Sequence, residues 1–205
     1  MTKNRELIAI LRGLTTDRCI RVSEILIAAG FNKLEVPLNS PHPLDTILAM
    51  QEKFGSSVII GAGTVTKVSE VNNLSGLGCQ MIVSPNTDKD VIKATKDKGM
   101  LSFPGVLTPS DCFSAINSGA DALKIFPAFK LGIDGFKAMK AVLPSDVKTY
   151  GVGGINENHF HEWLLAGLTG FGIGSNLFHP SMNDDDIKTK AKKIVIEYDS
   201  WFAQR

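Results

Sequence analysis

Residues 101–127 read LSFPGVLTPSDCFSAINSGADALKIFP, and this stretch decides the fold. A short β-type run, LSFPG (101–105), opens it, and a second one, ALKIFP (122–127), closes it. Between them, PSDCFSAINSG (109–119) has apolar residues at helical spacing and ends in glycine, which is a helix-stop signal. A strand, a helix and a second strand in this order predict a βαβ unit, whose two strands lie parallel in one sheet.

The same alternation runs through the whole chain. Helical patterns recur at 17–30, 68–78, 88–99 and 157–167, and a final amphipathic helix is expected over 184–202. β-type runs occur at 6–12, 33–38, 58–63, 80–85, 101–105, 122–127, 147–152 and 170–175. This is about the number of parallel strands that closes a (β/α)8 TIM barrel. We therefore predict an α/β fold, with one barrel domain over residues 1–205.

An open, doubly wound sheet is the alternative architecture for such an alternation. The first β-type run, however, lacks the G-x-G-x-x-G turn that dinucleotide-binding sheets carry after their first strand. The length of 205 residues lies at the short end of barrel lengths and leaves little room for a second domain. No linker or low-complexity tract interrupts the chain, so the barrel is the preferred prediction.

Composition excludes several classes of partner. The chain has 22 basic and 21 acidic residues, a formal net charge of +1, which gives no general attraction to nucleic acid or to a membrane surface. The three cysteines, Cys19, Cys79 and Cys112, are far apart, so neither a zinc cluster nor a disulfide framework is indicated. The first apolar run is too short for a signal peptide. A reducing, cytoplasmic location is the simplest expectation.

Charged side chains are predicted inside this barrel. Because alternate side chains of a strand point to opposite faces, Lys124 points inward if its apolar neighbours face the surrounding helices. The same reasoning on KLEVPL (33–38) turns Glu35 inward. Arg12 comes last in its run, on the same face as Ile8 and Ile10. One acid and two bases therefore converge on the carboxyl end of the barrel, where the active sites of such barrels lie.

These three residues favour carbonyl chemistry, although each also has a structural interpretation. Lys124 can extend its ammonium to the rim, Glu35 and Lys124 can form a structural ion pair, and Arg12 can cap a loop. Taken together, the three residues indicate a catalytic site. A lysine kept unprotonated by burial is nucleophilic toward a carbonyl and forms a Schiff base, and a nearby carboxylate can move the protons that this chemistry requires.

Glycine-rich turns predict a phosphate site beside these residues. YGVGGIN (150–156) follows the seventh β-type run, and GFGIGSN (170–176) ends the eighth. Barrels often bind phosphate with the loops after these two strands, since glycines let backbone N–H groups approach an anion. Asn156 is the expected cap of the next helix, and Thr64 in GAGTV (61–65) offers a hydroxyl. The four histidines show no metal-binding spacing, so no metal site is predicted.

Seven motifs, which span nearly the whole chain, resemble those of the 2-keto-3-deoxy-6-phosphogluconate and 6-phosphogalactonate aldolases. They are AILRG (9–13), EVPLNSP (35–41), GAGTV (61–65), IVSPN (82–86), FPGVLTPSD (103–111), ALKIFPA (122–128) and VGGIN (152–156). The resemblance implies a class I aldolase on a (β/α)8 barrel that assembles as a homotrimer and needs no cofactor. It implies that Lys124 is the Schiff-base lysine and Glu35 the general acid and base. It further implies a pyruvate end lined by Arg12, Thr64 and Pro85, and a phosphate site at Gly153, Gly154, Gly174 and Ser175.

Two positions are similar to the phosphogalactonate branch of this family. Gluconate-type enzymes typically carry arginine four residues after the catalytic glutamate, whereas this chain has Asn39. They also tend to have threonine before the Gly-Gly pair, whereas this chain has Val152. The implied reaction is cleavage of 2-dehydro-3-deoxy-6-phosphogalactonate to pyruvate and glyceraldehyde 3-phosphate.

Other functions remain as alternatives. The chain could act on 2-dehydro-3-deoxy-6-phosphogluconate or 4-hydroxy-2-oxoglutarate. A barrel with such a phosphate site could also be an isomerase or synthase for another phosphorylated metabolite, or a silent phosphosugar-binding protein. These last two classes have no use for an inward lysine opposite an inward glutamate.

Overall fold

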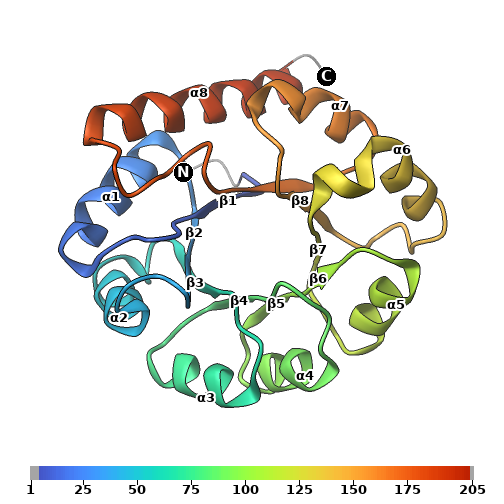
Figure 1. Ribbon diagram of the computed structural model, residues 1–205, viewed down its shortest axis with the longest axis horizontal. Helices are drawn as coiled ribbons and strands as arrows, with labels where there is room; N and C mark the ends of the chain where they lie inside the picture. The colour runs from blue at the N-terminus through green and yellow to red at the C-terminus, as the bar shows by residue number, and fades with distance from the viewer. Residues whose placement is uncertain (1–4, 204–205) are drawn as a thin grey trace.

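A computed structural model describes residues 5–203, and its strands form a ring surrounded by helices (Figure 1). The strands are β1 (Leu7–Ile10), β2 (Lys33–Pro37), β3 (Ile59–Gly63), β4 (Met81–Val83), β5 (Leu101–Phe103), β6 (Gly105–Val106), β7 (Leu123–Ile125), β8 (Thr149–Val152) and β9 (Gly170–Ile173). All pair in parallel, in the order β5-β4-β3-β2-β1-β9-β8-β7-β6.

The two strands at the ends of this order are halves of one barrel strand. Only Pro104 separates β5 from β6, and proline has no N–H to donate to a ladder. The carbonyl oxygens still bind on both sides: Phe103 accepts from the Ser84 N–H at 3.1 Å and Pro104 from the Lys124 N–H at 2.9 Å. The nine segments are thus the eight predicted strands with the fifth interrupted, and the ring closes. The (β/α)8 barrel is confirmed, and the doubly wound alternative is wrong.

Helices cover the outside of the ring (Figure 1). They are α1 (Thr16–Ala29), α2 (Pro43–Phe54), α3 (Val68–Gly76), α4 (Lys89–Asp97), α5 (Pro109–Asn117), α6 (Ala128–Lys140), α7 (Phe160–Leu165) and α8 (Asp184–Ala203), with a 3-10 turn, η1 (Glu157–His159), before α7. The predicted helical segments are confirmed, including the final one. Two more, α2 and α6, had not been singled out from the sequence. A non-helical Gly132 kinks α6.

The apolar side chains form two cores, one on each face of the strands. The outer core joins Leu34, Leu123 and Ile125 to residues of the helices. The inner core lies within the ring and contains Ile8, Ile10, Met81, Val83, Phe103, Ala122, Tyr150 and Val152. Strand alternation therefore works as expected, because the neighbours of Lys124 face the helices.

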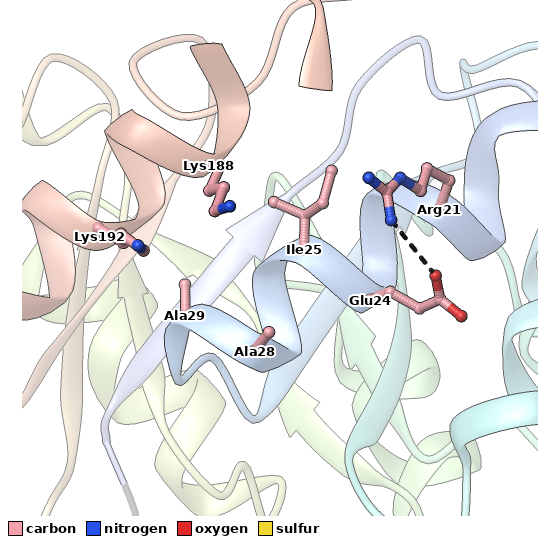
Figure 2. Close-up of a pocket in the computed structure, with 7 residues that line it drawn as sticks. All are labelled: Arg21, Glu24, Ile25, Ala28, Ala29, Lys188 and Lys192. Atoms are coloured by element: carbon pink, nitrogen blue, oxygen red, sulfur yellow. Dashed lines mark ion pairs between the residues drawn. The ribbon is translucent and has the colours of Figure 1, made fainter. Parts of the chain in front are cut away.

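The outer wall holds a cavity of its own, between α1 and α8. Its volume is about 250 Å³, and Figure 2 shows Lys188 and Lys192 of α8 opposite Ile25 of α1. Arg21 and Glu24 at its edge form an ion pair at 3.9 Å. None of its lining residues belongs to a strand, so this cavity is separate from the barrel interior. No helix within residues 5–203 has both the length and the apolar character needed to cross a membrane.

Candidate active site

Two strands and one loop bring the predicted charged residues to the carboxyl end of the barrel. Glu35 lies in the middle of β2 and Lys124 in the middle of β7, and both are buried, with exposed fractions of 2% and 8%. Arg12 follows β1 and is exposed. Both Lys124 and Arg12 influence the Glu35 carboxyl electrostatically, so the structure groups the three residues as predicted.

Lys124 is buried and forms no ion pair with any residue from 5 to 203. Its Nζ lies 4.6 Å from the centre of the Phe126 ring, two residues along the same strand. Burial lowers the pKa of the Lys124 ammonium, while the Glu35 carboxylate acts in the opposite direction and Arg12 adds to the lowering. Lys33 provides a contrast: it is as deeply buried, but its Nζ binds Glu6 Oε2 at 2.8 Å. The environment of Lys124 therefore favours a neutral amine.

Glu35 is held in a buried, constricted space. Its carboxylate fills the volume above Gly63 on the adjacent strand β3, and Oε2 accepts no hydrogen bond within the described chain. Burial raises the pKa of Glu35 to about 7, against the opposing effects of Lys124 and Arg12. No ion pair of 4.0 Å or less joins Glu35 to Lys124. A carboxyl of this kind can take up and release a proton near neutral pH.

Arg12 and Asn39 meet at the rim. Arg12 Nη1 donates to Asn39 Oδ1 at 2.6 Å, and both side chains are exposed. An arginine at residue 39 would have no oxygen to accept this bond and would bring a second positive charge next to the first. Asn39 thus orients the Arg12 guanidinium.

A cavity of about 410 Å³ opens beside this group, and we call it the glycine-loop cavity. It is lined by Ile10, Arg12, Val152, Gly153, Gly154, Ile155, Asn156, Gly172, Gly174, Ser175, Asn176, Phe178 and His179. Six of the predicted substrate- and phosphate-binding residues are among them: Arg12, Val152, Gly153, Gly154, Gly174 and Ser175. The loops after β8 and β9 meet here because these two strands are neighbours in the barrel.

The backbone of these loops is suited to binding an anion. The N–H groups of Gly153, Gly154 and Ser175 donate to no other residue in the described part of the chain. Gly153 and Gly154 have φ angles of 90° and 75°, which favour glycine, and a Cβ on Gly154 would lie 2.7 Å from Phe129 Cβ. Asn156 caps η1, as predicted, by accepting from the Asn158 N–H at 3.0 Å. Free N–H groups around a cavity form a cradle for a phosphate.

Thr64 and Pro85 lie outside the glycine-loop cavity. Thr64 follows β3 and takes a left-handed backbone conformation with φ of 60°, which is uncommon for a β-branched residue. Pro85 follows β4 and lines a second cavity of about 280 Å³, together with Phe126. Phe126 links this second cavity to Lys124, whose Nζ lies over its ring.

Gly63 and Phe126 are residues of the site that reasoning from the sequence missed. Phe126 could have been found, because alternation places it on the same face as Lys124. Gly63 gave no such signal, since its role depends on the register between β2 and β3, where it stands opposite Pro37.

The family model described as "Aldolase: KDPG and KHG aldolase" matches residues 1–193. The chain belongs to this family. It is accordingly an aldolase, an enzyme of the lyase class.

Individual relatives agree with this membership. The 2-dehydro-3-deoxy-6-phosphogalactonate aldolase of Escherichia coli (strain K12) is 41% identical over 192 residues, which cover 94% of each chain. A 2-dehydro-3-deoxy-phosphogluconate aldolase of Zymomonas mobilis is 32% identical over 144 residues, 70% of this chain and 68% of the relative. A solved structure described as "Native KDPGal structure" superposes with a TM-score of 0.96 at 39% identity, covering 99% of this chain and 98% of the other.

Proposed function

We propose that this chain is a class I aldolase that cleaves 2-dehydro-3-deoxy-6-phosphogalactonate to pyruvate and glyceraldehyde 3-phosphate through a Schiff base on Lys124. The observation that carries the proposal is the state of Lys124, which is buried at 8% exposure, has no ion-pair partner within the described chain and has its pKa lowered by burial. A lowered pKa increases the share of the unprotonated amine, which is the nucleophilic form.

The reaction begins at the substrate ketone. The neutral Lys124 amine attacks C2, and with uptake of one proton the ketone oxygen leaves as water, which gives an iminium ion. The final hydrolysis releases this proton again. The positive charge of the iminium ion can accept the electron pair of a breaking bond. The reaction therefore needs no further electron sink.

Glu35 moves the protons of the next steps. As a carboxylate, it takes the proton of the C4 hydroxyl, directly or through a water molecule. The C3–C4 bond then breaks, its electron pair passes to the iminium to form an enamine, and glyceraldehyde 3-phosphate leaves. The protonated Glu35 returns a proton to C3, and water hydrolyses the new iminium to release pyruvate and free Lys124. A carboxyl with a pKa of about 7 suits both directions of this transfer.

The remaining site residues would bind the two ends of the substrate. The N–H groups of Gly153, Gly154 and Ser175, with the adjoining Gly174, would hold the phosphate in the glycine-loop cavity. At the other end, Arg12, Thr64 and Pro85 would hold the keto-acid. Asn39 would orient Arg12 through its 2.6 Å hydrogen bond.

Support for the galactonate substrate comes from two residues and from the relatives. Val152 lines the glycine-loop cavity without offering a hydrogen bond, and Asn39 replaces the arginine of gluconate-type enzymes. The relative named for the galactonate substrate is also more similar than the one named for the gluconate substrate, at 41% against 32% identity.

We also propose that the enzyme is a cytoplasmic homotrimer, as the family resemblance implies. Large apolar side chains that stay exposed on the single chain are compatible with contacts between subunits. They include Phe129, Leu165 and Ile196, with exposed fractions of 61%, 71% and 67%. Light scattering on the purified protein measures the subunit number directly.

Borohydride reduction in the presence of pyruvate tests the central step. A Schiff-base aldolase gains the mass of a reduced pyruvate adduct, whereas a phosphosugar isomerase or a silent binding protein gains none. Assay of wild type with the galactonate and the gluconate substrates then identifies the preferred epimer. A protein that gains no adduct and cleaves neither substrate would refute the proposal.

A further inference from the structure

The loop after β9 places a histidine at the rim of the glycine-loop cavity. His179 and Arg12 are the two titratable side chains among the residues that line this cavity. The His179 side chain is exposed, and the mechanism described above makes no use of it.

The segment that carries His179 is firmly attached to the barrel. Arg18 of α1 donates to Pro180 O at 2.8 Å and to Met182 O at 2.9 Å. Pro180 packs on Gly13 so closely that a Cβ there would lie 2.6 Å from Pro180 Cγ. The Met182 N–H also donates to His179 O at 2.9 Å. The imidazole is therefore presented from a fixed backbone.

Hydrogen bonds within the segment also determine the tautomer of His179. The Ser181 backbone N–H donates to His179 Nδ1 at 3.3 Å, and the Ser181 hydroxyl lies 2.8 Å from the same nitrogen. A backbone N–H can only donate, so Nδ1 is the acceptor and Nε2 carries the hydrogen of the neutral ring. No residue within 5–203 accepts a hydrogen bond from Nε2.

We propose that His179 binds the phosphate group of the substrate through a hydrogen bond donated by Nε2. This inference rests on the proposed function, because it assigns a further ligand to the phosphate site of that reaction. The backbone N–H groups of Gly153, Gly154 and Ser175 can surround an anion on the loop side, but they are fixed by the main chain. The imidazole adds a side-chain donor from the loop after β9.

Two variants of His179 test the proposal. His179→Leu removes the donor, whereas His179→Gln retains an N–H at a similar reach. His161→Leu is the matched control, because His161 is partly exposed but contacts Ser200 and Glu197 of α8 instead of lining the cavity. The measurements are KM for the phosphorylated substrate, exchange of the methyl protons of free pyruvate, and calorimetric binding of inorganic phosphate.

Loss of one hydrogen bond to a charged group at this partly exposed rim should raise KM and weaken phosphate binding about five- to tenfold in His179→Leu. His179→Gln should recover most of this loss, and His161→Leu should match wild type. Exchange of free pyruvate, which carries no phosphate, should change far less than KM.

Three results would overturn the proposal: unchanged phosphate binding in His179→Leu, an equally weak His179→Gln, or equal damage to pyruvate exchange. The phosphate titration does not depend on turnover. A wild-type protein that binds phosphate through His179 but shows no exchange or cleavage would refute the proposed function and leave the phosphate ligand standing.

Discussion

The Glu35 carboxylate occupies the space that a side chain at Gly63 would need. Oε1 of Glu35 is the atom nearest to the position of a Cβ built on Gly63, and the two would overlap. The two residues lie on adjacent strands, with Gly63 two positions beyond Gly61, the register partner of Glu35. The absence of a side chain at Gly63 on β3 thus determines where the Glu35 carboxylate on β2 can lie.

Replacing Gly63 by alanine should move the Glu35 carboxylate and slow proton transfer. General acid–base groups typically contribute about 10²–10⁴-fold, so Gly63→Ala should reduce exchange of the pyruvate methyl protons by about 10²-fold. Lys124 is untouched, and borohydride trapping of pyruvate should persist. The measurements are proton exchange by NMR and adduct formation by mass spectrometry.

Gly76→Ala serves as the control for this variant. A Cβ on Gly76, at the end of α3, would meet nothing within 4 Å. This variant should fold and exchange protons like wild type. Normal exchange in Gly63→Ala would show that Glu35 can act from another position, and the proposed positioning role of Gly63 would then be wrong.

Pyruvate and borohydride should modify Lys124 and no other lysine. Lys33 is the relevant comparison, because it is equally buried but its ammonium is paired with Glu6 at 2.8 Å. Lys124→Met should lose turnover by ~10⁴-fold or more, as is typical when a covalent nucleophile is removed. Peptide mapping locates the adduct, and a label on Lys33 or on a surface lysine would contradict the mechanism.

Glu35→Gln should remove the part of the pH dependence of stability, and of catalytic activity, that comes from the Glu35 carboxyl. The carboxyl holds its proton more tightly in the folded chain, with a pKa of about 7, than at its ordinary value of 4.5. The stabilisation from this proton is fully present below pH 4.5 and is lost as pH rises through about 7. Urea unfolding should therefore show wild type losing stability relative to Glu35→Gln between pH 5 and pH 8.

Glu35→Gln should also change how the rate of pyruvate exchange depends on pH. Pyruvate exchange in wild type should rise with pH through about 7, as the carboxylate forms, and this limb should be absent in Glu35→Gln. Imine formation on Lys124 should largely survive. An identical pH profile in both proteins would remove Glu35 from its proposed role.

The inward position of the charged residues could be predicted from the sequence, because it follows from the two-residue period of a strand. Lys124 between Leu123 and Ile125, and Glu35 between Leu34 and Val36, needed only the assumption that the apolar neighbours face the helices. That the two glycine-rich loops meet could also be predicted, since the seventh and eighth strands of a barrel are neighbours.

Other features depend on packing between segments far apart in the chain. The fit of Glu35 over Gly63 requires the register of two strands, and the orientation of Arg12 requires the loop that carries Asn39. The fixed position of His179 requires Arg18, which is distant in sequence. Local patterns hold no information on such distances, so the burial that shifts the pKa of Glu35 could not be estimated from them.

The phosphate loop should not tolerate a side chain at Gly154. In Gly154→Ala, the new methyl group would lie 2.7 Å from Phe129 Cβ, and the φ of 75° is strained for alanine. The loop would have to shift, and its N–H groups would move away from the cavity. KM for the phosphorylated substrate should rise by roughly tenfold or more, the effect of losing at least one hydrogen bond to a charged group.

Gly99→Ala is the control for Gly154→Ala, because it introduces similar backbone strain away from the glycine-loop cavity. Gly99 has a similar φ of 71°, but a Cβ there would meet nothing within 4 Å, and it does not line the glycine-loop cavity. Gly99→Ala should lose some stability without a change in KM. Pyruvate exchange should suffer less than cleavage in Gly154→Ala, and equal damage to both would mean that the loop shapes the whole site.

Val152 allows a test of the choice between the two epimeric substrates. The side chain is 7% exposed, lines the glycine-loop cavity and belongs to the inner core with Ile10 and Tyr150, as strand alternation predicts. Val152 pairs in register with Gly172. Because Gly172 has no side chain, Val152 has room: a Cβ on Gly172 would lie 2.8 Å from Val152 Cγ2. A threonine would fit the same volume and add one hydroxyl to the cavity wall.

The galactonate and gluconate substrates differ only in the orientation of the C4 hydroxyl. Valine cannot hydrogen-bond either orientation, whereas a threonine hydroxyl can favour one. A hydrogen bond of this kind is worth about 1–3 kcal/mol, or roughly ten- to a hundredfold in kcat/KM. Val152→Thr should therefore shift the ratio of kcat/KM values toward the gluconate epimer. Val83→Thr, in the same inner core but outside the cavity, should leave the ratio unchanged. A strong gluconate preference in wild type that Val152→Thr does not alter would overturn the assignment of the galactonate substrate.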